Sequence, residues 1–434
     1  MKMQNINKPN INEKEYETQL EKWFKGLSSI TDSEIGITRL AFTDADWQAR
    51  AYIKTIMESL NLEIREDAFG NIFGRYTPMG MDEYIPAILI GSHIDSVPQG
   101  GNYDGVVGVL TGLAIIKFFK DLENQISSDY KQSLLQNPLE VVIFANEEGS
   151  RFGAATLGSR AIIGELANSE LDRLIDKQGL SLRTALITRN LKPNNIDTGN
   201  ILYKNPIKAF LEVHIEQGRV LEEKNYNLGI VTGIAAPARF KVTLYGNSDH
   251  SGATPMHMRR DTLCAAAELI LSLEEYAKEV SHTDEPVVGT IGVINVKPGA
   301  MNVIPGETEL GLDIRSISEV ARTKIVTHVK EKLEELSKKR NISYTIDEIT
   351  SENPISLSGN IIQTLSKACE NLNYEYIKMP SGAGHDAMNI AKLAPTGMLF
   401  IPCKNGISHN ALESAKLSDI TRAISVIIET IHLL

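Results

Sequence analysis

Side chains of the types that bind metal ions lie close together in the segment GSHIDSVPQGGNYDG. They are His93, Asp95 and Asp104, and the glycines between them let the loop fold tightly. The apolar run Ile85–Ile90 predicts a buried strand before this loop, and Val106–Phe119 predicts a buried helix after it. Such a connection places polar side chains at the end of a sheet, where α/β proteins bind ligands. An ordinary turn satisfied by backbone amides also fits this segment alone, so the site prediction depends on the rest of the chain.

Further polar residues follow other predicted strands. Together with the first loop they make five candidate ligands: His93, Asp104, Glu148, His214 and His409. Nitrogen and oxygen donors suit zinc, manganese or cobalt. Two histidines could each take a metal while a carboxylate bridges, and Asp104 is the natural bridge because its loop is rich in glycine. Asp95 could orient the imidazole of His93 from behind.

Glu147 and Glu148 are adjacent and follow the apolar residues Val141–Ala145. In an extended strand end, neighbouring side chains point to opposite sides, so one carboxylate could bind metal while the other faces a substrate. Hydrolysis needs this division, because a metal lowers the pKa of water to about 7 and a carboxylate takes the proton. The alternative is an exposed surface pair, which the preceding apolar run disfavours.

The elements around these residues predict an α/β fold in two domains. Strands alternate with helices up to residue 228, which favours a mostly parallel sheet. From residue 229 the pattern becomes βαββαβ, a ferredoxin-like arrangement. Its expected elements are a strand around Phe240, a helix over Asp261–Val280, strands over Thr290–Val296 and Glu309–Arg315, a helix over Ser318–Arg340 and a strand over Ile342–Ile349. We therefore expect a catalytic domain formed by residues 1–228 and 353–434, with residues 229–352 inserted as a dimerisation or lid domain.

Composition narrows the classes of partner and compartment. The chain has 434 residues and a net charge of −11 without a basic block, which disfavours nucleic acid as a partner. No apolar segment is long enough to span a membrane, and the first dozen residues lack the apolar core of a signal peptide. The three cysteines lie far apart, unlike a disulfide framework. These features predict a cytoplasmic protein.

Eight motifs in order carry a family resemblance: GSHIDSVPQGGNYDG, ANEEGSRF, EVHIEQG, DHSGATPM, MNVIPG, LDIRS, SGAGHDA and GISHNALES. Together they resemble the hydantoinase/carbamoylase family of dinuclear-metal amidases, which is related to the aminoacylase and carboxypeptidase-like metallopeptidases. The resemblance covers nearly the whole chain and implies two divalent metal ions per chain. It implies His93, Asp104 and His214 on one ion, and Asp104, Glu148 and His409 on the other. It also implies that Glu147 is the general acid/base.

Residues for substrate binding are assigned through the same resemblance. Arg315 lies on the polar face of a predicted strand and is implied as the anchor for a substrate carboxylate, although a surface arginine is the simpler interpretation from sequence alone. Gln217, His250 and Asn302, with the backbone of Gly384, are implied to hold the amide or ureido group. His250 would polarise the carbonyl, and a turn histidine is its alternative. His385 and Asp386 are expected to support the site.

These residues together predict a metal-dependent amidohydrolase. We expect its partner to be a small-molecule ureido or N-acyl amino acid substrate. The expected reaction is cleavage of the ureido C–N bond of N-carbamoyl-L-amino acids or similar ureido acids, giving an amino acid, carbon dioxide and ammonia. Allantoate amidohydrolase, an aminoacylase or dipeptidase, and a non-catalytic metal-binding homologue are the alternatives. The segment RFGAATLGSRAIIG favours the carbamoylases. In the resembling family, homodimers form through the inserted domain, which implies that His250 and Asn302 act on the partner's site.

Overall fold

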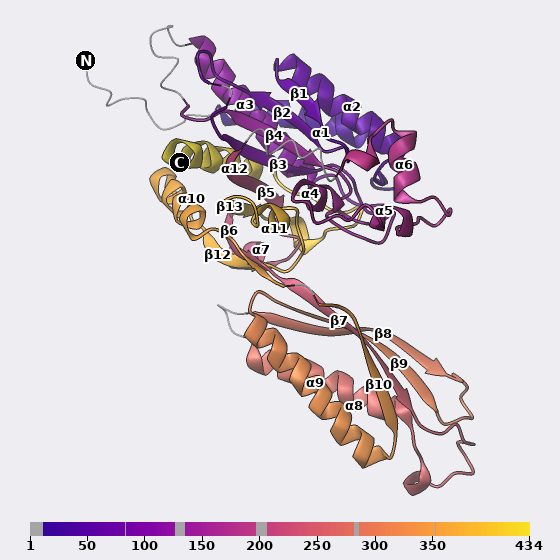
Figure 1. The fold of residues 1–434 in the computed structure, drawn as a ribbon. Helices are drawn as coiled ribbons and strands as arrows, with labels where there is room; N and C mark the ends of the chain where they lie inside the picture. The colour runs from indigo at the N-terminus through magenta and orange to yellow at the C-terminus, as the bar shows by residue number, and fades with distance from the viewer. Residues whose placement is uncertain (1–11, 83, 126–134, 197–205, 282–285, 352) are drawn as a thin grey trace. The chain divides into compact units, whose positions relative to one another are not determined.

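The structure is a computed structural model that describes residues 12–82, 84–125, 135–196, 206–281, 286–351 and 353–434 (Figure 1). The first dozen residues, whose sequence lacks the apolar core of a signal peptide, lie outside these ranges except for Asn12. The strands are β1 (Glu63–Glu66), β2 (Ile72–Tyr76), β3 (Ala87–His93), β4 (Leu139–Phe144), β5 (Ile207–Ile215), β6 (Gly229–Ile234), β7 (Ala236–Tyr245), β8 (Val287–Lys297), β9 (Glu307–Ser316), β10 (Ser343–Ser351), β11 (Ile355–Ser356), β12 (Ile377–Ser381) and β13 (Thr396–Ile401). The helices are α1 (Glu13–Ser28), α2 (Asp44–Ser59), α3 (Val106–Gln125), α4 (Leu157–Ile162), α5 (Glu170–Arg173), α6 (Leu182–Thr188), α7 (Val220–Lys224), α8 (Thr262–Val280), α9 (Glu319–Arg340), α10 (Gly359–Leu372), α11 (Ala387–Ile390) and α12 (Leu417–Leu433), with short 3-10 turns η2 (Pro193–Asn195), η4 (Met256–Met258) and η5 (Lys404–Gly406).

The chain divides into two compact units, which are described separately. The first comprises residues 1–232, 357–379 and 385–434, and the second comprises residues 233–356 and 380–384. The predicted domain boundaries at 229 and 352 lie within a few residues of this division. Within the described ranges, no helix combines the length and apolar character needed to cross a bilayer.

The sheet of the first unit is parallel at its centre. Strands β4, β3, β5 and β13 lie side by side in that order and pair in parallel. Antiparallel pairs flank them, with β2 and β1 beyond β4 and with β6 beyond β13. The prediction of an α/β fold with a mostly parallel sheet is confirmed, and the antiparallel strands lie at its margins.

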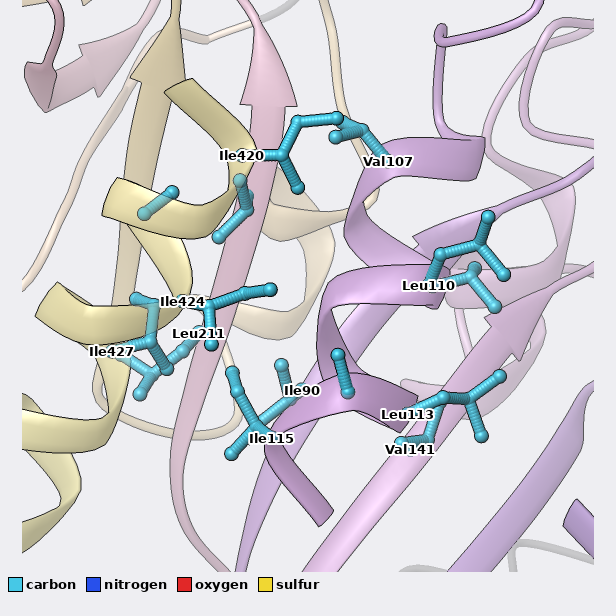
Figure 2. Close-up of a cluster of buried hydrophobic side chains, with 14 of the residues drawn as sticks. Ile90, Val107, Leu110, Leu113, Ile115, Val141, Leu211, Ile420, Ile424 and Ile427 are labelled. Carbon is cyan, nitrogen blue, oxygen red and sulfur yellow. The ribbon is translucent and has the colours of Figure 1, made fainter. Parts of the chain in front are cut away.

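A large apolar core packs helices against this sheet. Helix α3 is buried along most of its length because its apolar residues cover all sides of its first four turns. It packs against α12 and against the central strands, and Figure 2 shows Leu110 and Leu113 near Val141, with Ile424 of α12 facing the same layer. This core fixes the strands and the first turn of α3, between which the loop of Asp104 runs.

The second unit has the predicted βαββαβ order. Its strands form one antiparallel sheet in the order β10-β7-β9-β8, and α8 and α9 contribute to its core. Strand β9 alternates half-buried and buried residues, so its charged side chains all lie on the face away from that core. Leu263, near the start of α8, is exposed, because the packed face of this helix runs through Ala265, Ala266 and Leu269.

Candidate metal centre and active site

The carboxyl ends of the central parallel strands meet at one edge of the sheet, and the predicted ligands lie there. His93 is the last residue of β3, and Glu148 follows β4. The apolar run in the sequence predicts a strand over Ala209–Val213 that ends before His214. In the structure His214 lies inside β5, because the pairing of this strand with β13 continues to Ile215. His409 follows β13 after the short turn η5.

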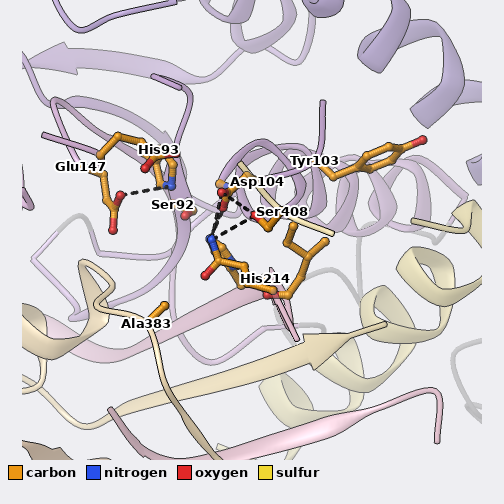
Figure 3. A network of polar contacts seen from close by, with 12 residues as sticks. Ser92, His93, Tyr103, Asp104, Glu147, His214, Ala383 and Ser408 are labelled. Carbon is orange, nitrogen blue, oxygen red and sulfur yellow. Dashed lines mark hydrogen bonds and ion pairs between the residues drawn. The ribbon is translucent and has the colours of Figure 1, made fainter. Parts of the chain in front are cut away.

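Two groups of donor atoms form at this edge and share Asp104. The inner donor group is His93, Asp104 and His214, and the outer donor group is Asp104, Glu148 and His409. Within each group the ligand atoms lie within 4.8 Å of one another. Asp104 directs Oδ1 to His214 Nε2 at 3.2 Å and Oδ2 to His409 Nε2 at 3.0 Å. Its two oxygens therefore face the two groups, as a bridging carboxylate requires. Figure 3 shows Asp104 and His214 pointing toward each other.

Backbone carbonyls fix the ring orientation of the two inner histidines. His93 Nδ1 lies 3.0 Å from the carbonyl oxygen of Asp95, and His214 Nδ1 lies 2.9 Å from that of Ile215. A carbonyl can only accept, so both Nδ1 atoms carry the proton. Nε2 of each ring is then directed to the site, which is the arrangement found in histidines that ligate metals.

Asp95 organises the loop of the two glutamates. Its Oδ1 accepts from the backbone N–H of Glu147 at 3.1 Å, and its Oδ2 accepts from that of Glu148 at 3.2 Å. Glu148 Oε2 lies 3.3 Å from His409 Nε2, whereas Glu147 Oε2 lies 3.6 Å from His93 Nε2 and is absent from both donor groups. The predicted division between one ligand and one proton acceptor fits this geometry.

Burial and mutual repulsion dominate the electrostatics of the acidic groups. Burial, and then the charge of Glu148, raises the pKa of Glu147 well above its usual range. Burial and the charge of Asp104 do the same for the pKa of Glu148. Burial lowers the pKa of His93 to about 4, so its imidazole is neutral at pH 7. The neutral imidazole of His93 beside crowded carboxylates is a donor suited to a divalent cation, whose charge would offset the repulsion.

Gly105 allows the loop to approach His93. Its φ is +66°, a left-handed conformation, and a Cβ atom there would lie 2.4 Å from Cε1 of the His93 ring. Its backbone N–H faces His214 Nε2 at 3.3 Å. No other residue type fits this position without displacing the imidazole.

Several contacts near the donors were not predicted. The side-chain amide of Gln217, a predicted substrate residue, donates to Asp104 Oδ2 at 2.9 Å. Glu413 accepts from backbone N–H groups of the Asp104 loop. Glu212 lies with His214 and His385 in a third, buried cluster of possible ligand atoms. The occurrence of Glu413 in the motif GISHNALES and of Glu212 two residues before His214 was the available signal.

His385 and Asp386 are the two residues predicted to support the site, and that role stays a prediction. The His385 and His214 rings pack edge to face, with centroids 4.5 Å apart. Asp386 accepts a hydrogen bond from the hydroxyl of Ser159, which also accepts from Asn389 Nδ2 at 2.9 Å. Both residues are buried.

His250, Asn302, Arg315 and Gly384 belong to the second unit and are described within it. His250 pairs as an isolated bridge with Val303, beside Asn302. Its Nδ1 accepts from the backbone N–H of Gly252 at 3.1 Å and from that of Ala253 at 3.2 Å. The neutral ring therefore carries its proton on Nε2, which makes that atom a hydrogen-bond donor.

Arg315 is already held by an aspartate. Its Nε and one terminal nitrogen donate to the two oxygens of Asp313, each at 3.0 Å, and the other terminal nitrogen donates to the carbonyl of Gly382 at 3.0 Å. Arg239 Nε also donates to Asp313, at 3.1 Å. A guanidinium has five N–H groups, so these contacts leave two of them for a substrate carboxylate.

Comparison with known proteins assigns the family. The sequence profile of peptidase family M20/M25/M40 matches residues 89–433, most of the chain. The chain belongs to this peptidase family. M20 enzymes are metal-dependent, and the two donor groups of this member are its candidate ligand sets.

The relatives of this M20 member include amidases of ureido compounds. A ureidoglycolate hydrolase from Oryza sativa subsp. japonica is 40% identical, with 94% of this chain and 82% of that protein covered. An N-carbamoyl-L-amino-acid amidohydrolase from Pseudomonas sp. (strain NS671) is 37% identical, covering 91% of this chain and 92% of that protein. The crystal structure of a hydantoinase/carbamoylase family amidase from Burkholderia multivorans has a TM-score of 0.86 at 29% identity, covering 96% of this chain and 97% of that chain. The predicted resemblance is confirmed, and so is the predicted class, a hydrolase of linear amide and ureido C–N bonds.

Proposed function

We propose that this M20 amidohydrolase cleaves the ureido C–N bond of N-carbamoyl-L-amino acids, releasing an amino acid, carbon dioxide and ammonia. The observation that carries this proposal is the pair of donor groups sharing Asp104, with Glu147 beside them but outside both. The relative named N-carbamoyl-L-amino-acid amidohydrolase supports the choice of substrate.

The inner and outer donor groups would hold two divalent ions of the zinc, manganese or cobalt type, because their donors are imidazole nitrogens and carboxylate oxygens. When bound, such ions polarise a carbonyl and lower the pKa of water. Glu147 Oε2 takes the proton of the attacking water and passes it to the leaving nitrogen. Asp95 keeps Glu147 in place through the backbone N–H, independently of its carboxylate.

The remaining predicted residues would bind and orient the substrate. The Nε2–H of His250 would donate to the ureido oxygen as negative charge develops on it, and Asn302 beside it would bind the same group. Arg315, held flat by Asp313, would present its two remaining N–H groups to the α-carboxylate. Gln217 and the backbone of Gly384 would complete this binding.

A direct assay tests the proposal. The protein is incubated with manganese(II) and a panel of N-carbamoyl-L-amino acids. Ammonia release is measured for ureido substrates, and the newly formed amino group is measured for dipeptides. Ureidoglycolate, allantoate and simple dipeptides serve as competing substrates. Preferential turnover of a carbamoyl amino acid supports the proposal, and no ammonia from any ureido substrate contradicts it. Such a result would favour a non-catalytic homologue.

Ureidoglycolate is a second candidate substrate. The relative from Oryza sativa that is named for it is 40% identical to this chain. Ureidoglycolate also combines a ureido group with a carboxylate, so the same donors would bind it. In the panel, a kcat/KM at least tenfold higher for ureidoglycolate than for any carbamoyl amino acid would select this alternative.

We also propose a cytoplasmic homodimer in which His250 and Asn302 act on the partner's site. Strand β8 is an edge of its sheet and exposes Val293 and Ile294, while Met301 beside Asn302 is fully exposed. Exposed apolar side chains on an edge strand suit a self-complementary contact.

Complementation of two inactive variants tests the dimer. Glu147→Gln and His250→Ala are co-expressed, and mixed dimers are isolated by two affinity tags. If His250 acts in trans, each mixed dimer has one intact site of its two, so the isolated mixed dimers should regain about half of wild-type activity. If verified mixed dimers remain inactive, His250 acts within its own chain.

A further inference from the structure

Glu413 joins two loops of the candidate site that are far apart in sequence. Its Oε1 accepts from the backbone N–H of Tyr103 at 2.8 Å and from that of Asp104 at 3.0 Å. Its Oε2 accepts from the hydroxyl of Ser408 at 3.1 Å. We call Glu413, Ser408 and these two N–H groups the Glu413 clamp. The clamp connects the loop of Asp104 to the loop that carries His409.

Ser408 extends the clamp to the shared carboxylate itself. Its hydroxyl lies 3.1 Å from Asp104 Oδ2 as well as 3.1 Å from Glu413 Oε2. A hydroxyl has one proton, so it donates to one of these carboxylates at a time. Gln217 Nε2 lies 3.3 Å from the same hydroxyl and 2.9 Å from Asp104 Oδ2. The position of Asp104 is thus defined from both its backbone and its side chain.

The carboxylate of Glu413 packs directly on the loop that it holds. A Cβ atom on Gly101 would lie 2.1 Å from Glu413 Oε1, so this contact exists only because residue 101 is glycine. Glu413 is only 5% exposed. A buried carboxylate near Asp104 adds repulsion to an already acidic site, whereas a neutral side chain could accept the same N–H groups at lower cost. Its charge becomes favourable once a cation lies close by.

The two donor groups depend differently on this clamp. In the inner group, His93 and His214 lie on strands, and backbone carbonyls orient their rings. In the outer group, His409 lies on a loop, and its side chain is 48% exposed. That loop is closed by a backbone hydrogen bond from Lys404 to Ser414 at 2.7 Å. Glu413 lies at its end, where it determines how the loop meets Asp104.

We propose that Glu413 is a positioning residue for the outer cation: the clamp sets Asp104 Oδ2 and the His409 loop in register, and its charge strengthens binding at the outer donor group. The inner donor group shares Asp104 with the outer one, but its two histidines keep their orientation without the clamp, because backbone carbonyls hold their rings. The inference rests on the proposed function only in that both require two bound ions per chain, and it does not depend on the substrate.

Metal titration of the full chain tests the inference without an activity assay. Metal-free protein is titrated with manganese(II), and free manganese is followed by its electron paramagnetic resonance signal. Variants Glu413→Gln and Glu413→Ala are compared with wild type. Gln keeps an oxygen acceptor for the two N–H groups but loses the charge, and Ala loses both.

Asp176→Asn is the matched control. Asp176 is also a buried acid whose one oxygen accepts two backbone N–H groups, those of Gln178 at 3.0 Å and Leu180 at 2.9 Å, but it lies outside both donor groups. It reports the effect of loosening another loop of the same unit, together with loss of the ion pair between Asp176 Oδ2 and Arg151 Nε at 3.1 Å. Thermal unfolding of each metal-free variant measures the general loss of stability.

We expect wild type to bind two ions, one more weakly than the other. The affinity for the weaker ion should fall about tenfold in Glu413→Gln and about a hundredfold in Glu413→Ala, which is the range measured for residues that hold metal ligands in place. The other ion should stay within about threefold, and Asp176→Asn should keep both affinities. Unchanged binding in Glu413→Ala, or equal weakening of both ions in line with the control, overturns the inference. If wild type binds only one ion, both the inference and the proposed pair of bound ions are wrong. Wild type that binds two ions without releasing ammonia contradicts only the proposed substrate.

Discussion

Replacement of Glu147 by glutamine separates proton transfer from metal binding. Glutamine has the same size, so the packing around this buried side chain is retained. The hydrogen bond to Asp95 is also retained, because it is made by the backbone N–H of residue 147. What is lost is the ability to take a proton from water.

The size of the effect follows from the environment of Glu147. Burial and the neighbouring carboxylates raise its pKa, which makes it a stronger base than a solvent-exposed glutamate. A positioned acid/base contributes roughly 10²- to 10⁴-fold to the rate. This corresponds to about 3–5 kcal/mol of transition-state stabilisation. We therefore expect kcat to fall by at least about a hundredfold, with little change in metal content.

Glu148→Gln is the matched comparison, since it removes a carboxylate one residue along the same loop. Glu148 Oε2 lies 3.3 Å from His409 Nε2 within the outer donor group, so this variant should lose one ion. Ammonia release gives kcat, and plasma mass spectrometry after dialysis gives the ions per chain. A Glu147→Gln protein with near-normal kcat refutes the base assignment. Loss of an ion in Glu147→Gln but not in Glu148→Gln would exchange the two roles.

Three further predictions use other parts of the structure. Arg315→Ala should cost about 2–4 kcal/mol in kcat/KM for substrates with a free carboxylate. An analogue with an amidated carboxylate should be barely affected, and equal losses would make Arg315 structural. Gly105→Ala should lower the free energy of unfolding by about 1–2 kcal/mol because of the left-handed backbone alone, and it should weaken manganese binding because the new Cβ displaces His93. An unchanged melting temperature and an unchanged manganese affinity would contradict this. Removal of bound ions by a chelator should lower the melting temperature, because an ion present at a hundred times its Kd adds about 2.7 kcal/mol to the free energy of unfolding. An unchanged melting temperature would show that ions do not bind the folded chain tightly.

Much of the candidate site could be predicted from strand ends. Apolar runs placed His93 and Glu148 where strands end, and parallel strands bring such residues to one edge. The order of those strands could not be predicted, because β5 and β13 pair across nearly two hundred residues of chain. His214 shows why strand boundaries are hard to predict. Its strand is extended by backbone hydrogen bonds to β13, and these produce no pattern in the side chains.

The contacts that hold the ligands in place were harder to predict from the sequence than the ligands themselves. The hydrogen bond from the Asp104 backbone to Glu413 joins residues 309 positions apart. The pairing of Arg315 with Asp313 is close in sequence, but a strand pattern shows only that both lie on one face. Such contacts depend on exact loop paths, which apolar periodicity and turn residues do not specify.

The loop paths themselves indicate why the site converges on Asp104. Three residues that follow strands of the parallel centre of the sheet have left-handed backbones: Asn146 (φ 57°), Gln217 (φ 57°) and His409 (φ 55°). Asparagine tolerates this conformation, but for glutamine and histidine it costs about 1–2 kcal/mol each. Both of the latter direct a nitrogen to Asp104 Oδ2, at 2.9 and 3.0 Å. Backbone strain persists where surrounding contacts hold it, and it clusters at functional sites. The strain here is therefore located where two strand-end loops turn their side chains onto the carboxylate that both donor groups share.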